Sequence, residues 1–494
     1  MRDVWAPRGR RVAAAPVTFR AAAITFRAAL AAQPATFRAA VAALAALAAL
    51  ACLAGEATAQ RSQLEQRILR DTLANGLEVI VVPNPGVPLV TIEAVVRNGA
   101  FTQPPEYEGL AHLYEHMIFG ANSRWPLPGA FMGRLGELGA DFNGTTSEER
   151  VNYYLTLSAD SIEPGMRALA AALRTPIFRA DEMDRERQVV IGEYDRNEAD
   201  PFYNFQRAMG RALYGSAWSR KNALGERRVI LAATPAMMRE IQRRYYVPNN
   251  TALIVAGDVT PERALALARA VFGDWSRAPD PFAADPVPPV PPLERNSAII
   301  VEQPIGNSIV VMRQWHGPSA RGDVAATYAA DVFSDVLNQP TSRFKQRLVD
   351  SGLFQSIHVN YYTLNHTGPI TIMGETSPER LTEALAALDA ELRLVAQPGY
   401  ITAAELEPVK RQRTAGTMFS LERPSGFAHQ VGFWWSVTGL EYFMGYVDAM
   451  ARQTPAEVQS YAARYIVGKP SVTGVLVSPE VRRRLELTES AVMR

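Results

Sequence analysis

Cysteine is nearly absent from this sequence. Cys52 is the only one among 494 residues, so an intrachain disulfide cannot form. Cys52 lies within an apolar N-terminal run, and a chain cleaved after that run would carry no thiol at all. Such a chain is compatible with an oxidising compartment, although its composition does not require one.

The sequence also lacks a strong net charge, with a formal value of +1. Residues 1–59 contain seven arginines and no lysine, against Asp3 and Glu56, so the remaining residues carry a formal charge of −4. This balance argues against nucleic-acid binding, which requires a basic surface. Hydrophobic residues make up 48% of the chain and charged residues 20%, a composition that favours large folded cores over disorder.

The N-terminal segment lacks an apolar run long enough to span a bilayer, which takes about 20 residues. Residues 39–55 are almost free of polar side chains, and Ala57-Thr58-Ala59 fits a small-x-small cleavage site before Gln60. We therefore predict that residues 1–59 are a signal peptide. The mature chain is expected to be periplasmic or secreted and to have no stable transmembrane span. The alternative is a membrane anchor formed by an uncleaved leader.

Strand and helix patterns alternate on both sides of a proline-rich segment. Seven prolines lie between Pro279 and Pro292, a composition that we expect to sustain neither a helix nor an interior strand. Residues 278–296 are therefore predicted to be a stiff linker. The predicted strands are 79–82, 91–96, 152–157 and 251–256 before it, and 299–301, 309–312, 356–362, 369–374 and 472–477 after it. The predicted helices are 161–174, 181–199, 235–245 and 261–272 before it, and 323–338, 377–395 and 402–413 after it.

This repetition predicts an α+β fold of two duplicated domains of similar size, at residues 60–277 and 297–494. The aromatic-rich residues 418–435 are expected to pack the second of them.

Histidine is rare as well, with six in the chain, yet two lie close together in Gly109-Leu-Ala-His112-Leu-Tyr-Glu115-His116. Residues four apart project from one face of a helix, so both imidazoles could bind one metal ion. Glu115 lies beside that metal without being a ligand. The pattern His-x-x-Glu-His is the inverse of the commoner zinc-protease motif. The alternative is a hydrogen-bonded histidine pair on a half-buried helix.

A catalytic zinc site needs a third protein ligand and one open position. Glu186 and Glu193 are seven residues apart, so they share one face of the predicted helix 181–199 with Val190 between them. A carboxylate on a packed face is costly unless it is paired or bound to metal. We predict that Glu193 is the third ligand and that Glu186 orients a histidine. The alternative is an ordinary solvated, charged helix.

These residue types point to peptide hydrolysis without a covalent intermediate. Zinc lowers the pKa of a bound water to about 7. Glu115 would accept the proton from that water as it attacks a carbonyl and would then pass it to the leaving amine. Zinc and neighbouring donors would stabilise the developing oxyanion.

These motifs resemble those of the inverzincin metallopeptidases, the family that includes pitrilysin, insulysin and mitochondrial processing peptidase. Residues 109–116 look like the family's Gly-Leu-Ala-His-x-x-Glu-His, and residues 186–193 resemble its Glu-Arg-x-x-Val-x-x-Glu. The resemblance covers nearly all of the chain after the leader. It implies one Zn²⁺ per chain, bound by His112, His116 and Glu193 and supported by Glu186. It also implies two homologous domains that enclose a peptide like a clam.

The segment Asn143-Gly144-Thr145 resembles the family's edge strand, which holds an extended substrate. An open sheet edge can accept a peptide as an added strand, in agreement with that role. An ordinary turn is the alternative at Asn143-Gly144.

The second half departs from the family pattern. Active members usually present an Arg and a Tyr there, but Val349 and Gln355 stand at those positions, and Arg347, Tyr361 and Tyr362 have the wrong spacing. Some members divide the zinc site and the Arg/Tyr pair between two chains. We therefore predict a zinc endopeptidase that forms a heterodimer with a paralogous subunit carrying that pair. The alternative is a non-catalytic, peptide-binding scaffold subunit.

Overall fold

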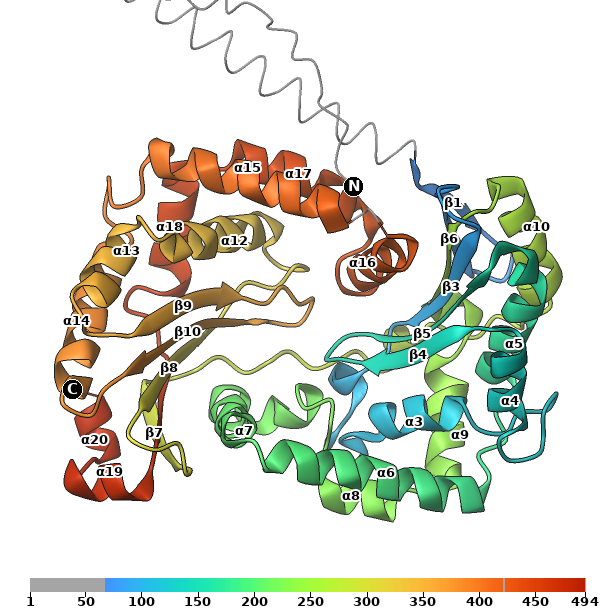
Figure 1. Cartoon of the computed structure of the whole chain (residues 1–494), viewed down its shortest axis with the longest axis horizontal. Coiled ribbons are helices and arrows are strands. Elements are labelled where there is room, and N and C mark those ends of the chain that lie inside the picture. The colour runs from blue at the N-terminus through green and yellow to red at the C-terminus, as the bar shows by residue number, and fades with distance from the viewer. Residues whose placement is uncertain (1–66, 421–422, 494) are drawn as a thin grey trace, which may run out of the picture. The chain divides into compact units, whose positions relative to one another are not determined.

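The computed structural model describes residues 67–420 and 423–493 (Figure 1). The predicted leader, its cleavage site and Cys52 lie outside these residues. The fold class predicted from the sequence is confirmed, since the described residues form two β-sheets with helices packed on both. No helix in the described ranges is both long and apolar enough to cross a membrane.

The first sheet has six strands in the order β1-β2-β6-β3-β5-β4. They are β1 (Leu69–Thr72), β2 (Glu78–Pro83), β3 (Leu89–Val96), β4 (Asp141–Thr146), β5 (Val151–Ser158) and β6 (Thr251–Gly257). β2 and β6 are parallel, whereas β6, β3, β5 and β4 pair antiparallel in turn. β4 therefore forms one edge of this sheet.

The second sheet has five strands in the order β7-β11-β8-β10-β9. They are β7 (Ser297–Glu302), β8 (Ile309–His316), β9 (Ser356–Tyr361), β10 (Pro369–Thr376) and β11 (Val472–Val477). β7 and β11 are parallel, and the remaining neighbours are antiparallel. Apart from β1, the two sheets thus share one strand order and one set of strand directions, as a duplication requires. β9 in the second sheet corresponds to β4 in the first.

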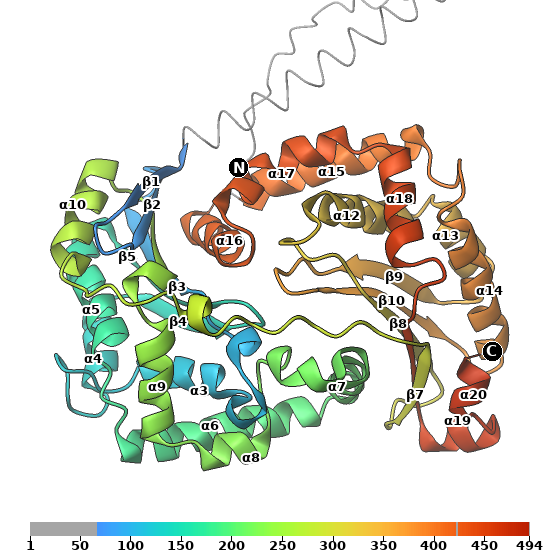
Figure 2. The ribbon, with the colours of Figure 1, turned by 180° about the vertical axis from the view of Figure 1, so that it is seen from behind.

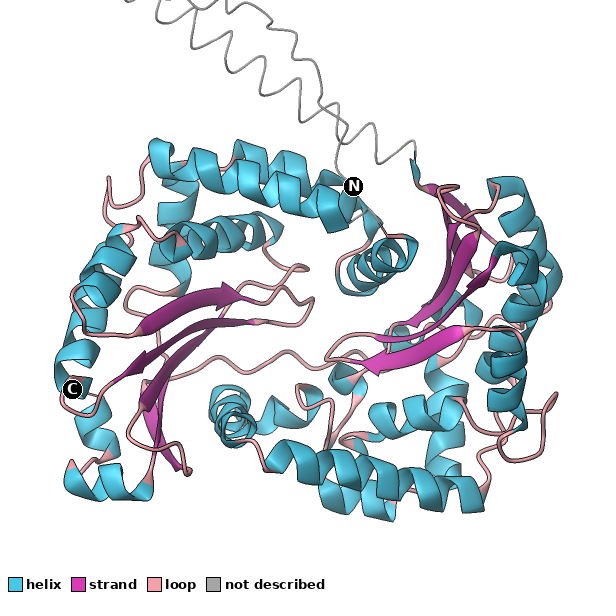
Figure 3. Cartoon of the chain, in the orientation of Figure 1, coloured by secondary structure: helices cyan, strands magenta, loops and turns pink. Residues whose placement is uncertain are grey.

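Helices connect these strands (Figure 3). The first half contains α3 (Leu110–Ile118), α4 (Ala130–Glu137), α5 (Ile162–Arg174), α6 (Ala180–Glu198), α7 (Pro201–Tyr214), α8 (Arg227–Ala232), α9 (Pro235–Tyr245) and α10 (Pro261–Phe272). The second half contains α12 (Val324–Asn338), α13 (Arg343–Lys345), α14 (Leu381–Leu394), α15 (Ala403–Ser420), α16 (Pro424–Val437), α17 (Leu440–Arg452), α18 (Pro455–Tyr465), α19 (Pro479–Arg484) and α20 (Glu489–Val492). Short 3-10 or π turns lie at Ala100–Thr102, Pro105–Tyr107, Ala159–Ser161, Gly215–Arg220, Pro248–Asn250 and Gln346–Asp350.

The proline-rich segment contains one element that we did not expect. Residues 281–284 form a single helical turn, α11 (Pro281–Ala284), within the otherwise extended connection seen in Figure 2. Pro281 is at the first helical position, where its missing N–H costs nothing, and Asp280 accepts a hydrogen bond from the backbone N–H of Phe282. The expectation that this composition sustains no helix was therefore wrong for one turn.

Each sheet packs helices of its own half on one face and a helix of the other half on the opposite face. α7 buries Phe205, Met209 and Leu213 against β8 and β11 of the second sheet. In return, α16 buries Phe427 and Trp435 against β2, β3 and β6 of the first sheet. Figure 1 shows α16 beside β3 and β6, and α7 near β7 and β8. The sequence analysis expected the aromatic residues 418–435 to pack the second domain. Phe427 and Trp435 of α16 instead pack on the first sheet.

A glycine in the second sheet tests this exchange of helices. A Cβ at Gly474 would meet Met209 Sδ and would lie 2.7 Å from the Phe205 ring, so Gly474→Ala is expected to overpack the interface. We predict a loss of about 1–3 kcal/mol in the free energy of unfolding, measured by urea denaturation. Gly133→Ala in α4 has open space around it and is predicted to be neutral or to stabilise by up to about 1 kcal/mol. Equal effects of the two changes would contradict this packing.

Candidate active site

Helix α3 begins at a glycine that no other residue could replace easily. Gly109 has a φ of +92°, and a Cβ there would lie 2.6 Å from Gly225 Cα. Its backbone N–H donates to Gln103 Oε1 at 2.8 Å. After this start, Leu110, Leu113 and Met117 are buried in the core of the first half. The packing of that apolar face turns His112 and His116 together toward α6.

His112, His116 and Glu193 come together between α3 and α6. His112 Nε2 lies 3.3 Å from His116 Nε2 and 3.5 Å from Glu193 Oε2, and His116 Nε2 lies 3.9 Å from the same oxygen. Among the described residues, these three side chains form the one group of His, Cys, Asp or Glu that could hold a metal ion.

The dimensions of this triangle fit a zinc ion. Zinc binds histidine nitrogen and carboxylate oxygen at about 2.0–2.2 Å in tetrahedral geometry, which places neighbouring ligand atoms about 3.3–3.5 Å apart. Two of the three separations match that value, and the third exceeds it by a few tenths of an ångström. Two imidazoles and one carboxylate are also a donor set typical of catalytic zinc, with a fourth position left for water.

Burial and the neighbouring carboxylates affect the pKa values of the two histidines differently. Burial, and then the nearby His116, lower the pKa of His112 to about 3 in the metal-free protein, so its imidazole is uncharged at neutral pH. Burial alone would also lower the pKa of His116, but the hydrogen bond with Glu186 and the charges of neighbouring carboxylates outweigh it and raise the pKa. His116 Nδ1 lies 3.3 Å from Glu186 Oε2. A proton on Nδ1 is therefore donated to Glu186, which leaves Nε2 directed at the metal position.

Glu115 is a buried neighbour of His116 and Glu193. It is 9% exposed, and burial raises the pKa of its carboxyl, partly opposed by a hydrogen bond. That bond comes from Thr146 on β4, whose Oγ1 donates to Glu115 Oε2 at 2.7 Å. Sequence reasoning missed Thr146. The period of a strand carried the signal, since residues 144 and 146 of β4 share one face.

The three predicted substrate-binding residues all lie on β4, the edge strand of the first sheet. Gly144 faces Glu115 so closely that a Cβ there would lie 2.8 Å from Glu115 Cγ. Asn143 and Thr145 are exposed and point to the other face. The predicted turn alternative for Asn143-Gly144 is wrong, because both residues pair with β5 in regular register. The strand edge and the carboxylate of Glu115 are thus adjacent.

The second half carries an ion pair in the region that corresponds to the candidate metal ligands of the first half. Helix α12 follows β8 as α3 follows β3, and it presents Asp331 and Asp335 four residues apart. Arg413 of α15 makes two hydrogen bonds to Asp335, at 2.7 and 2.9 Å, and lies 3.9 Å from Asp331. Tyr446 donates to Asp331 at 2.6 Å. One guanidinium therefore interacts with both carboxylates of this acidic pair.

The nearby Arg and Tyr residues of the second half are engaged elsewhere. Arg347 donates to Glu391 at 2.9 Å, and the hydroxyl of Tyr361 donates to the Pro318 carbonyl at 2.8 Å. Tyr362 hydrogen-bonds Glu148. None of these hydrogen-bond partners belongs to the triangle of His112, His116 and Glu193.

Comparisons with known proteins give a consistent result. The family model described as "Insulinase (Peptidase family M16)" matches residues 78–226, and that described as "Peptidase M16 inactive domain" matches residues 232–413. An insulin-degrading enzyme homolog of Dictyostelium discoideum is 30% identical over 147 residues, which are 30% of this chain and 15% of that protein. The uncharacterized zinc protease YmxG of Bacillus subtilis is 23% identical over 366 residues, which are 72% of this chain and 85% of that protein.

Solved structures share the fold. The first half of the periplasmic protease PqqL from Escherichia coli superposes with a TM-score of 0.72 at 19% identity, covering 86% of this chain and 95% of that chain. This chain therefore spans a small part of the insulin-degrading enzyme homolog but most of YmxG. The two family models together match most of the described residues, and the relatives include named zinc proteases. These comparisons therefore support peptidase family M16 as the family of this chain.

Proposed function

We propose that this chain is a zinc-dependent endopeptidase that hydrolyses extended peptides by means of a metal-activated water. The observation that carries the proposal is the triangle of His112, His116 and Glu193, with Glu115 beside it. The names of relatives such as YmxG agree with this chemistry. One zinc per chain follows from the single group of candidate ligands among the described residues.

The residues around the site have distinct roles in this proposal. A zinc ion held by His112, His116 and Glu193 would lower the pKa of water and polarise a peptide carbonyl. Glu115 would accept a proton from the attacking water and deliver it to the leaving nitrogen. The hydrogen bond from Thr146 holds one oxygen of Glu115, and Glu186 fixes the ring of His116.

The open edge of β4 is the proposed binding surface for substrate. A peptide in extended conformation would add to this edge through backbone hydrogen bonds, as in other cases of strand addition. The recognition would be largely independent of side chains, with Asn143, Gly144 and Thr145 next to the bound peptide. The short distance between Gly144 and Glu115 would bring the scissile bond to the catalytic carboxylate.

We further propose that full activity requires a paralogous subunit, which would supply the Arg and Tyr that this chain lacks. The partners found for Arg347, Tyr361 and Tyr362 support this requirement, because each side chain is engaged within this chain. Export of the mature chain is also proposed, and the periplasmic origin named for the similar PqqL structure supports it.

A non-catalytic, peptide-binding subunit is the second candidate function. The missing Arg and Tyr favour it, as does the description "inactive domain" of the family model that matches residues 232–413. The intact set of His112, Glu115, His116 and Glu193 favours catalysis. The two candidates differ in whether wild-type protein, paired with its partner, cleaves any peptide.

Replacement of the proposed base should separate metal binding from catalysis. Glu115→Gln is expected to retain one zinc per chain and to lower kcat by about 100- to 10,000-fold, because no carboxylate remains to accept the proton. Glu193→Gln is expected to lose zinc together with activity. Glu198→Gln on the same helix, where the native side chain pairs with Arg227, serves as the control and should change neither. Metal analysis and peptide hydrolysis by the complex with its partner are the measurements, and unchanged hydrolysis by Glu115→Gln would remove Glu115 from its role.

The close approach of β4 to Glu115 gives a second test. Gly144→Ala places a methyl group against Glu115 Cγ and should displace the carboxylate while the zinc ligands stay in place. We expect kcat to fall by about 10- to 100-fold at unchanged zinc content. Gly136→Ala in α4, which has open space around it, is the matched control and should retain full activity. Loss of zinc in Gly144→Ala would show that the change acts through the metal site instead.

The requirement for a partner is tested by mixing. The purified mature chain should bind zinc but hydrolyse peptides slowly, and addition of a paralogue that carries the Arg/Tyr pair should raise kcat/KM. Removal of the Arg in that paralogue should reverse the gain. Full activity of the chain alone would contradict the requirement.

A further inference from the structure

The turn between β4 and β5 holds a buried carboxylate whose partners all come from the other half of the chain. Glu149 is 2% exposed. Its Oε2 accepts from the backbone N–H of Asn365 at 2.6 Å, and its Oε1 accepts from the backbone N–H of His366 at 2.7 Å. His366 Nδ1 adds a third contact at 3.1 Å. A carboxylate buried this deeply requires such partners, so the contact is a strong one.

A second buried charge from the first half holds the other side of the same loop. Lys221 is 7% exposed, and its Nζ donates to the carbonyl of His366 and, at 2.9 Å, to that of Thr367. Thr367 has a φ of +58°, an unfavourable conformation for a residue that is not glycine. The β9–β10 loop (residues 362–368) is thus held by two opposite charges of the first half. The carboxylate of Glu149 accepts hydrogen bonds from its N–H groups, and the ammonium of Lys221 donates to its carbonyls.

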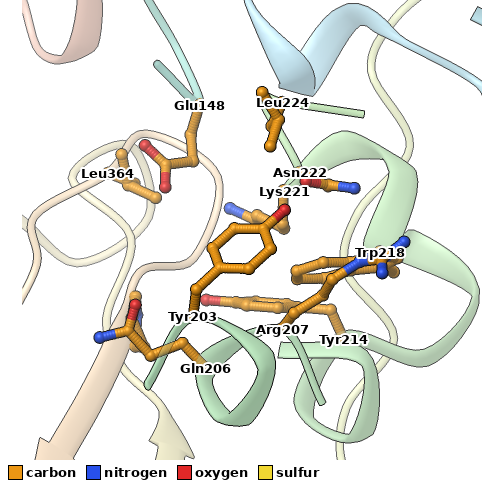
Figure 4. Close-up of a pocket in the computed structure, with 11 residues that line it drawn as sticks. Glu148, Tyr203, Gln206, Arg207, Tyr214, Trp218, Lys221, Asn222, Leu224 and Leu364 are labelled. Atoms are coloured by element: carbon orange, nitrogen blue, oxygen red, sulfur yellow. The ribbon is translucent and has the colours of Figure 1, made fainter. Parts of the chain in front are cut away.

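Neighbouring residues extend this grip. The ring of His366 stacks on Phe101, with centroids 5.2 Å apart. The backbone N–H of Phe101 donates to the Glu148 carbonyl at 2.8 Å, so the same residue supports the β4–β5 turn. Lys221, Glu148 and Leu364 also line a cavity of about 300 Å³ beside the loop (Figure 4). The β4–β5 turn and the β9–β10 loop occupy equivalent places in the two sheets, because β9 and β10 are the counterparts of β4 and β5.

The gripped turn continues directly into the strand that contacts the proposed base. Thr146, three residues before Glu149, donates to Glu115, and Gly144 lies against the same side chain. Displacement of the turn would therefore move the hydrogen bond that holds Glu115 and the edge that would bind the peptide.

We propose that Glu149, gripping the β9–β10 loop of the second half, is a positioning residue that holds β4 in register with Glu115. The second half would then serve catalysis without contributing a group to the reaction. This inference rests on the proposed function, since it concerns the same base and the same strand edge.

Two variants test this role in the full mature chain, zinc-loaded and paired with its partner. Glu149→Gln and His366→Ala should each lower kcat by about 10- to 100-fold, with a much smaller change in KM and one zinc retained per chain. The double variant should fall little further than Glu149→Gln alone, because His366→Ala removes the side-chain part of the contact that Glu149→Gln already weakens. Independent, additive losses would overturn the proposal.

Glu441→Gln is the matched control. It makes the same chemical change in another contact between the halves, the 2.6 Å ion pair of Glu441 with Arg70, which does not touch the β4–β5 hairpin. Its kcat should remain that of the wild type. An equal loss of kcat in Glu441→Gln would show that any weakening of the contact between the halves lowers activity, and would contradict a specific role of Glu149.

Hydrogen–deuterium exchange provides a readout that is independent of activity. Residues 141–146 should exchange faster in Glu149→Gln and His366→Ala than in the wild type and in Glu441→Gln. If the wild type hydrolyses no peptide with any partner, the proposed function fails, but the exchange result still decides whether Glu149 holds β4. Unchanged exchange at residues 141–146 in both variants would overturn the proposal.

Discussion

The convergence of two imidazoles and one carboxylate between α3 and α6 is the constraint on which the remaining structure depends. These three side chains come within 4 Å of one another in a partly buried place, and their nitrogen and oxygen atoms form a set that could hold one metal ion. The apolar faces of both helices hold it, with Met117 and Val190 in the core of the first half. The packing of the core thus fixes the positions of α3 and α6, and the polar faces of these helices carry the candidate metal ligands.

The exchange of helices between the halves gives the second half a structural role, although its described residues contain no group that could hold a metal ion. α16 completes the core on the second face of the first sheet, and α7 does the same for the second sheet. Large apolar surface would be exposed on both sheets if the halves separated, so each half depends on the other for its fold. The hydrogen bonds of Glu149 and Lys221 to the β9–β10 loop add directional contacts between the halves to this apolar packing.

Local patterns predicted the parts of the site that lie within one helix. His112, Glu115 and His116 could be identified because their spacing alone defines a shared face. Glu193 required a decision about which helix packs on α3, which rested on the face it shares with Glu186 and Val190 and was then strengthened by the family resemblance. Thr146 and the partners of Glu149 depend on contacts between distant segments, which no local period encodes. For the same reason the packing of α7 on the second sheet was not predicted, and residues 418–435 were expected to pack only the second domain: an apolar stripe indicates that a helix face is buried, but not which sheet covers it.

The ion pair of Arg413 with Asp331 and Asp335 has a consequence for how the two halves respond to their surroundings. A bound metal can dissociate, exchange or be removed by a chelator, and the charge balance between α3 and α6 changes with it. The guanidinium is covalently tethered and stays protonated at any physiological pH. The second half therefore keeps its internal cation whether or not the proposed zinc is bound between α3 and α6.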